Sequence, residues 1–198
     1  MFAYLHGAFK HKSPTSVVVD CSGVGYEVHI SLYTYGKMES LESGRLWIQQ
    51  IVREDKHTLY GFIDQVEKEL FNYLISVSGI GPNTARLILS GMTPGSVKSA
   101  IMSEDHVSFT RVKGVGPKTA KRLIVELKDK IEKISAGQEF GIPTNQSNTS
   151  REEALSALIT LGFQKAQVLK AIAKVEQTLD EDAETEMWIK TALQQLAG

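Results

Sequence analysis

A twelve-residue segment occurs twice in this chain, at a constant offset of 35 residues. The first copy runs from Val77 to Ile88 and the second from Val112 to Leu123. Both contain glycine, an apolar residue, glycine and proline, followed by a polar or basic residue, threonine and alanine. Such self-similarity at a fixed spacing indicates two copies of one supersecondary unit.

Each copy is typical of two helices joined by a tight turn. Apolar residues on one helical face precede the first glycine, and Pro82 and Pro117 suit the first position of a helix, where a missing N–H costs nothing. The glycines permit positive φ and close approach of the backbone to an external group. We expect Ile80 to anchor the first turn in the core. The helix that starts at Pro117, after the second turn, should bury Ala120, Leu123, Ile124, Leu127, Ile131 and Ile134.

Charge is concentrated around the second copy. The whole chain has a formal charge of -1, but residues 65–142 hold eleven basic and eight acidic side chains, whereas residues 143–198 hold five basic and eight acidic. Basic residues are unfavourable at the start of a helix, where free N–H groups attract anions. Their presence beside Pro117 therefore favours an external anion such as phosphate, although a solvated helix face remains the alternative.

Gly-apolar-Gly before a helix resembles the helix-hairpin-helix family, in which hairpin amides hold DNA phosphates without reading sequence. The expected DNA-facing residues are Gly79, Ile80, Gly81, Asn83 and Thr84 in the first copy, and Gly114, Val115, Gly116, Lys118, Thr119, Lys121 and Arg122 in the second. Asn83 occupies the place of Lys118, so the first hairpin should bind phosphate more weakly. An ATP-binding loop is excluded, because glycine would be needed where the chain has Val112 and Pro117.

Residues 1–63 show alternating, β-branched runs separated by turn residues, such as Thr15–Asp20 and Gly25–Ser31. About five short strands in this length predict a small closed barrel of the oligonucleotide-binding (OB) type, with an SH3-like barrel as the alternative. A long hairpin carries Glu54 and Asp55 at its tip. Adjacent acids are common in turns, so these two carboxylates alone indicate neither catalysis nor a metal site.

Residues 135–150 are polar, with two glycines and a proline, and read as a flexible linker. Three amphipathic helices follow, over residues 150–163, 164–175 and 184–196, and predict a small acidic bundle that docks a partner rather than DNA. Its first helix ends at Leu161-Gly162-Phe163, which resembles the turn of ubiquitin-associated (UBA)-like bundles. These three residues serve either a contact patch or simply the core.

Other classes of site find little support. Cys21 is the single cysteine, the five histidines are scattered, and no metal-ligand spacing is present, so we expect neither catalytic residues nor a metal or other cofactor. Apolar runs are too short to cross a bilayer and the first residues do not resemble a secretory signal. A cytoplasmic location without membrane contact is therefore expected.

Over essentially its whole length the chain resembles the RuvA family of Holliday junction-binding subunits. The most specific segments are Gly114–Lys128 and Arg53–His57 leading to Leu59-Tyr60-Gly61-Phe62. The resemblance implies a multidomain α+β chain: an OB-type barrel with an acidic pin (1–64), a tandem helix-hairpin-helix domain (65–142), a flexible linker (143–149) and a three-helix UBA-like domain (150–198). It also implies that Glu54 and Asp55 form the pin.

The resemblance further implies a non-catalytic subunit that holds a four-way DNA junction open and square-planar for branch migration in recombination and DNA repair. Homotetramers, one or two per junction, would bind the DNA. The hexameric ATPase RuvB, which alone uses ATP, would dock on the last domain through Leu158, Leu161, Gly162 and Phe163. The resolvase RuvC would be a further partner.

Two other classes stay open from the residues alone. A general repair scaffold would bind duplex through the hairpins and recruit a nuclease, without preference for junctions. A glycosylase-type enzyme would need a catalytic Lys or Asp beside a base pocket. Asp129 lies too far along its helix from the hairpin for that role, so a binding module is preferred over an enzyme.

Overall fold

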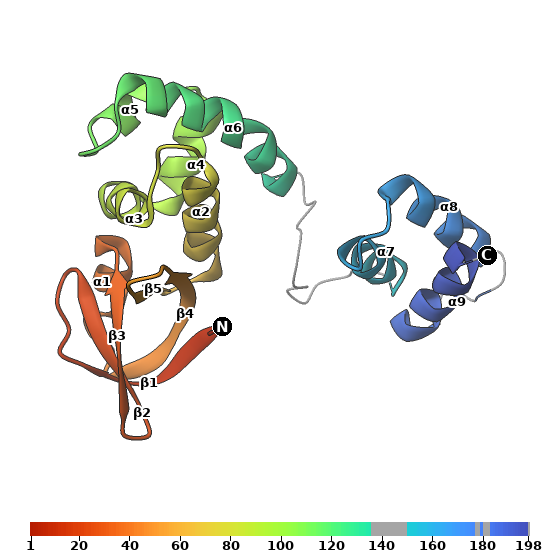
Figure 1. Cartoon of the computed structure of the whole chain (residues 1–198), viewed down its shortest axis with the longest axis horizontal. Helices are drawn as coiled ribbons and strands as arrows, with labels where there is room; N and C mark the ends of the chain where they lie inside the picture. Colours follow the sequence, from red (N-terminus) through yellow and green to blue (C-terminus); the bar gives the residue numbers. More distant parts are fainter. Residues whose placement is uncertain (136–149, 177–178, 180–182, 198) are drawn as a thin grey trace. The chain divides into compact units, whose positions relative to one another are not determined.

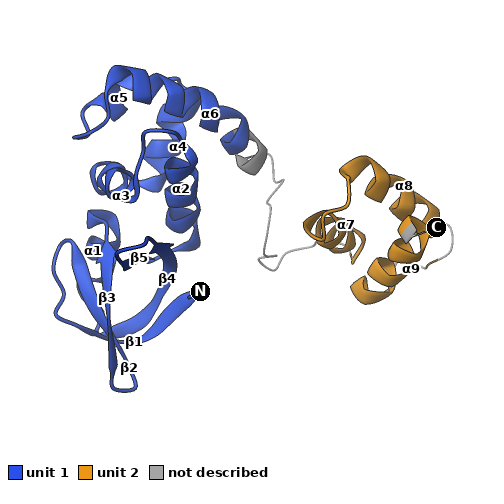
Figure 2. Cartoon of the chain, viewed as in Figure 1, with its two compact units in different colours: residues 1–136 blue, residues 137–198 orange. Residues whose placement is uncertain are grey.

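The computed structural model describes residues 1–135, 150–176, 179 and 183–197, without the side chains of 132–135 and 197. It divides the chain into two compact units, Met1–Ala136 and Gly137–Gly198 (Figure 2). The linker predicted at 143–149 lies outside the described residues. The predicted boundary at 64/65 falls between the last strand of the barrel and the next helix, inside the first unit.

Five strands form the closed barrel that the sequence predicts (Figure 1). Their order around the barrel is β1-β2-β3-β5-β4, with β3 and β5 parallel and the other neighbours antiparallel. The prediction of an OB-type barrel is confirmed. The strands are β1 (Tyr4–Lys10), β2 (Ser16–Cys21), β3 (Val24–Ile30), β4 (Ser43–Val52) and β5 (His57–Phe62).

A short helix, α1 (Leu32–Met38), joins β3 to β4 and is absent from the sequence prediction. Ser31 caps its first turn by accepting a hydrogen bond from the Thr34 N–H. Met38, at its last turn, is fully buried in the barrel core beside residues such as Val17 and Leu46, which alternate along their strands with outward-facing neighbours. The helix thereby fills one end of the barrel interior.

Five helices complete the first unit. In the first repeat α2 (Gln65–Ser76) precedes the hairpin and α3 (Pro82–Gly91) follows it. In the second the corresponding helices are the five-residue α5 (His106–Thr110) and the long α6 (Pro117–Ser135). The connecting helix α4 (Pro94–Met102) is capped by Thr93. The tandem arrangement of the prediction is thus confirmed, with the connecting helix α4 as an addition.

The barrel and the hairpin helices share one core. Tyr60 and Phe62 of β5 belong to the same buried cluster as Phe71 of α2 and the apolar residues of both hairpins, Ile80 and Val115. The rings of Phe62 and Phe71 lie 4.9 Å apart between centroids. The helices therefore pack directly on the end of the barrel at β5, which limits how the hairpins can move relative to the strands.

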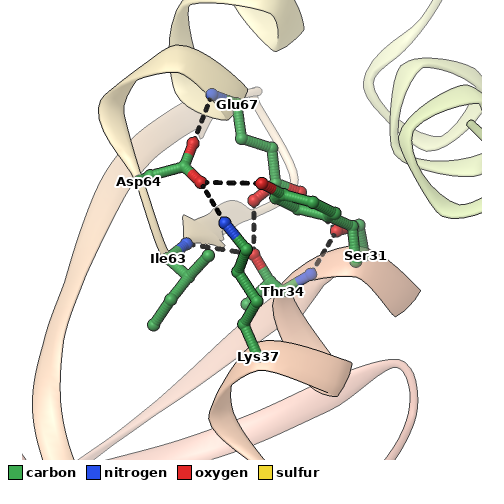
Figure 3. A network of polar contacts seen from close by, with 7 residues as sticks. Ser31, Thr34, Lys37, Ile63, Asp64 and Glu67 are labelled. Atoms are coloured by element: carbon green, nitrogen blue, oxygen red, sulfur yellow. Dashed lines mark hydrogen bonds and ion pairs between the residues drawn. The ribbon is translucent and has the colours of Figure 1, made fainter. Parts of the chain in front are cut away.

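A buried polar network ties α1 to α2 (Figure 3). The hydroxyls of Ser31 and Thr34 donate to the two carboxylate oxygens of Glu67, whose side chain is fully buried. Burial raises the pKa of Glu67 to about 7, although both hydroxyl bonds oppose the shift. Asp64 caps α2 through the Glu67 N–H and also accepts from Lys37 at 3.1 Å. The network fixes the angle at which α2 leaves the barrel.

The second unit is the predicted three-helix bundle, with α7 (Ser150–Thr160), α8 (Lys165–Val175) and α9 (Thr185–Ala197). Its buried core contains Ala154, Leu158, Val168, Ala171, Ile172, Val175, Trp188 and Ala192.

Candidate nucleic-acid interface

The two hairpins have the same backbone geometry. Gly79 has a φ of +95° and Gly114 a φ of +93°, a region that other residues adopt only with strain. In each hairpin the next residue turns inward: Ile80 and Val115 are almost fully buried. Their N–H groups donate to the Val77 and Val112 carbonyls at 3.0 Å in both cases. Ile80 and Val115 therefore hold the loops to the core, and their side chains are not exposed to a ligand.

Each hairpin packs against the other. The Thr84 hydroxyl lies 3.7 Å from the position that a Cβ would take on Gly114, and the Thr119 side chain lies at the same distance from that position on Gly79. Arg122 of α6 also donates to the Ser78 carbonyl at 3.5 Å. The two loops are thus brought side by side by reciprocal contacts.

The helices that leave the hairpins start with uncapped amides. Gly81, the residue before α3, has no side chain and so supplies no capping oxygen. Gly116 is equivalent, and its carbonyl accepts from the Ala120 N–H at 2.9 Å. N–H groups in the first turns of α3 and α6 can therefore serve an external anion, which the helix dipole also favours.

The second hairpin is lined by exposed cations. Lys118 and Lys121 are exposed, and within the described residues neither has a carboxylate at ion-pair distance. Arg122 lies 3.9 Å from Glu126, but both side chains are over 40% exposed, so this pair adds little. These side chains can lie over phosphates without first breaking a strong internal bond.

The first hairpin uses its polar residues differently. Asn83, at the position of Lys118, accepts a hydrogen bond from the Tyr60 hydroxyl at 3.1 Å. Arg86, at the position of Lys121, donates to the carbonyls of Thr15 and Ile30 in the barrel, at 3.1 and 3.2 Å. The cation of this repeat is therefore directed to the barrel, which lowers the positive charge offered at the first hairpin.

Glu54 and Asp55 lie at the tip of the long hairpin between β4 and β5. The strand ladder extends to the pair Val52 and His57, and the Arg53 N–H donates to the Lys56 carbonyl at 2.9 Å to close the tip. Both carboxylate side chains are exposed. An exposed pair of negative charges on a supported hairpin repels phosphates that come close to it.

In the second unit, the residues predicted to dock a partner separate into buried and exposed ones. Leu158 is fully buried in the helix core, so its side chain is not part of the exposed surface of this unit. Leu161 is 63% exposed, and Gly162, with a φ of +99°, turns the chain after α7. Phe163 is half-buried against the core. The exposed part of this turn is therefore Leu161 and Gly162, with one side of Phe163.

Three polar features of the first unit are not predicted from the sequence. They are the hydrogen bond from Tyr60 to Asn83, the hydrogen bonds from Arg86 to the barrel, and the burial of the Glu67 side chain. A signal existed for two of them: Asn83 breaks the alignment of the repeats, and Glu67 lies in a helix beside apolar residues that become core. The apolar periodicity of the helix does not indicate that Arg86 bonds to the barrel.

Within the ranges that the structure describes, no group of three or more His, Cys, Asp or Glu side chains is placed to hold a metal ion. Among the described helices, none combines the length and apolar character needed to cross a membrane.

Comparison with known proteins covers nearly the whole chain. Family models match residues 1–61 (RuvA N terminal domain), 71–129 (SAM-like Helix-hairpin-helix tandem) and 149–197 (RuvA, C-terminal domain). The chain is 46% identical over 196 residues to a protein of Flavobacterium psychrophilum, covering 99% of this chain and 100% of the relative. It is 45% identical over 198 residues to a protein of Christiangramia forsetii, with the same coverage. Both relatives are named Holliday junction branch migration complex subunit RuvA.

Proposed function

The chain belongs to the RuvA family, and on that premise we propose that it is the non-catalytic subunit that binds four-way DNA junctions for branch migration in recombination and repair. Its relatives are named as subunits of the Holliday junction branch migration complex. The observation that carries the proposal for this chain is the pair of hairpins in mutual contact, the second with Lys118 and Lys121, which have no carboxylate partner in the part of the chain that the structure describes.

Phosphate binding follows from the geometry of the hairpins. Uncapped amide N–H groups at the starts of α3 and α6 can donate to phosphate oxygens, and the lysines of the second hairpin add charge. None of these groups reads a base edge, so affinity is expected to be independent of sequence. The proposed contacts are the loop and helix-start residues named above, with Ile80 and Val115 acting only by holding the loop backbones in place.

Specificity for a junction requires a second element. The pin, defined as Glu54 and Asp55, would lie where strands exchange and would repel their phosphates. A continuous duplex would meet this repulsion without gaining the contacts of four arms. Charge of the same sign as the ligand thus discriminates against the wrong substrate.

The proposed partners are those that membership of the RuvA family implies. Homotetramers, one or two on each junction, would match the four arms, and the hexameric ATPase RuvB would dock on the second unit at Leu161, Gly162 and Phe163. ATP would be used by RuvB alone, so this chain needs no cofactor. RuvC would act on the same junction, and the complex would work in the cytoplasm.

A titration on DNA tests the proposal. The full chain is titrated against a fluorescent four-way junction and against linear duplex of the same total length, at two salt concentrations, with and without magnesium. Tighter binding to the junction, with an affinity that falls steeply with salt, is expected. Equal affinity for both DNAs would contradict junction binding and favour a general repair scaffold.

A further inference from the structure

The bond between Tyr60 and Asn83 connects the strand that follows the pin to the first hairpin. The Tyr60 hydroxyl of β5 donates to the Asn83 Oδ1 at the start of α3, at 3.1 Å. Asn83 is exposed, whereas Tyr60 is only 5% exposed. A buried donor thus holds one end of an exposed side chain at a position where the second hairpin has Lys118.

The ring of Tyr60 has little freedom. It packs against Phe71 with centroids 5.1 Å apart and against His29 with centroids 5.7 Å apart. The hydroxyl is therefore held at one place, where the barrel meets the helices. Because it bonds to Asn83, it also restricts that side chain before a ligand arrives, which lowers the entropy lost on binding.

An asparagine amide can present either end to a ligand. Its carbonyl oxygen would repel a phosphate, whereas its NH2 group would donate to one. Because the Oδ1 of Asn83 receives the Tyr60 hydroxyl, the NH2 group is left for a partner outside the barrel. Burial raises the pKa of Tyr60, although the positive charge of Arg86 opposes the shift, so the hydroxyl keeps the proton that it donates to Asn83.

We propose that Tyr60 is a positioning residue for DNA: by donating to the Asn83 Oδ1, it directs the Asn83 NH2 group toward a backbone phosphate at the first hairpin. This inference rests on the proposed function, since it names how one hairpin of that interface binds. It also gives the two hairpins different chemistry. The first offers a neutral, oriented donor and the second offers mobile cations.

The difference has a measurable signature. A cation that contacts phosphate releases counterions, so its loss reduces the dependence of affinity on salt by about one unit per contact. A neutral amide releases none. Removing the contact of Asn83 should therefore weaken binding equally at low and high salt.

The experiment is a double-mutant cycle on the full chain. Binding of Y60F, N83A and Y60F/N83A to a fluorescent four-way junction is measured by anisotropy over a series of salt concentrations. Y60F removes the hydroxyl and keeps the ring, and a lost neutral hydrogen bond predicts weakening of about fivefold. N83A should weaken binding to a similar extent, and the double variant no further.

Two further variants separate positioning from general damage. Y73F makes the same chemical change in a tyrosine that packs against the same core, and it should bind as the unchanged protein does. N83K replaces the oriented amide by a cation; its affinity should fall more steeply with salt, and adding Y60F should not change it.

The outcomes are distinct. Equal, non-additive losses with unchanged salt dependence support the positioning role. Additive losses, or junction affinity unchanged in Y60F, overturn it. Failure of the proposed function would instead be seen in the unchanged protein, as equal affinity for junction and duplex.

Discussion

The Thr84 hydroxyl lies against Gly114 of the other hairpin, 3.7 Å from the place of a missing Cβ, and Thr119 repeats this contact on Gly79. The distance is an ordinary van der Waals contact, so there is room for a methyl group on either glycine. What an alanine cannot do there without strain is adopt the positive φ. The requirement for glycine at these two positions is therefore one of backbone conformation.

Substitution of the two glycines of one hairpin should give opposite results. Gly114→Ala should lower the free energy of unfolding by about 1–2 kcal/mol, because its φ is +93°. Gly116→Ala should cost much less stability, since no atom lies within 4 Å of the new Cβ. Its methyl group instead hinders approach of the DNA backbone, so junction affinity should fall.

Thermal denaturation and anisotropy of the same two preparations check this prediction. Comparable loss of stability in both variants would contradict the separation of roles between the glycines.

Removal of the lysines of the second hairpin should weaken binding to every DNA. Lys118→Ala and Lys121→Ala should each reduce the slope of log affinity against log salt by about one unit. Lys170→Ala, an equal loss of charge on the exposed face of α8, is the control and should leave the slope unchanged. A slope that is identical in all three variants would exclude phosphate contacts by Lys118 and Lys121.

Neutralisation of the pin should alter discrimination rather than affinity. In E54Q/D55N the repulsion of phosphates is lost, so duplex binding should strengthen and the junction-to-duplex ratio should fall by about tenfold, equivalent to about 1.4 kcal/mol. Competition between the two DNAs measures the ratio. The matched control is E152Q/E153Q on α7, which removes the same charge from the second unit. An unchanged ratio in E54Q/D55N would exclude the pin role.

The buried Glu67 predicts a dependence of stability on pH. Its pKa is raised from 4.5 to about 7 in the folded chain, so between these values the folded state holds a proton that the unfolded state has lost. This contribution to stability is complete below pH 4.5 and is lost as pH rises through 7, a change of about 3 kcal/mol.

Glu67→Gln removes the titrating group and keeps the shape. Denaturant unfolding of both proteins from pH 4.5 to 8 should show the variant gaining stability relative to the unchanged chain as pH rises. Parallel curves would contradict a shifted pKa at Glu67.

The turn after α7 offers a test of docking. Leu161→Glu should preserve the folding of the second unit, because the side chain is mostly exposed, but should weaken stimulation of the RuvB ATPase. Leu158→Ala, by contrast, opens a cavity in the helix core and should cost about 2–5 kcal/mol of stability. Full stimulation by the Leu161→Glu variant at low protein concentration would remove this turn from the docking surface.

The sequence predicts elements well where they repeat or alternate, and less well where they are short. The repeated Gly-apolar-Gly-Pro segment predicts both hairpins, and alternation predicts the barrel. Helix α1 is not predicted, because a seven-residue helix carries too few turns for a periodic apolar face. Helix α5 is predicted only through the repeat, since its five residues show no such face of their own. Both helices depend on caps, at Ser31 and Asp105, and on packing.

The sequence predicts which residue types form the candidate site, but it does not predict in which direction each side chain points. Leu158 and Leu161 are both apolar and three residues apart, yet one is in the core and the other is exposed. Arg86 and Lys121 occupy equivalent positions, yet Arg86 bonds to barrel carbonyls. These directions depend on neighbours distant in sequence, such as Thr15 and Ile30, which one local pattern does not contain.

The core shared between β5 and the hairpin helices has a consequence for evolution. Tyr60 and Phe62 are strand residues of the barrel, but their rings are covered by helical residues such as Phe71. A gene fusion that carried the barrel alone to another protein would leave both rings exposed to water. Recombination between genes that separated the barrel from the hairpins of this chain would therefore cost stability in both parts.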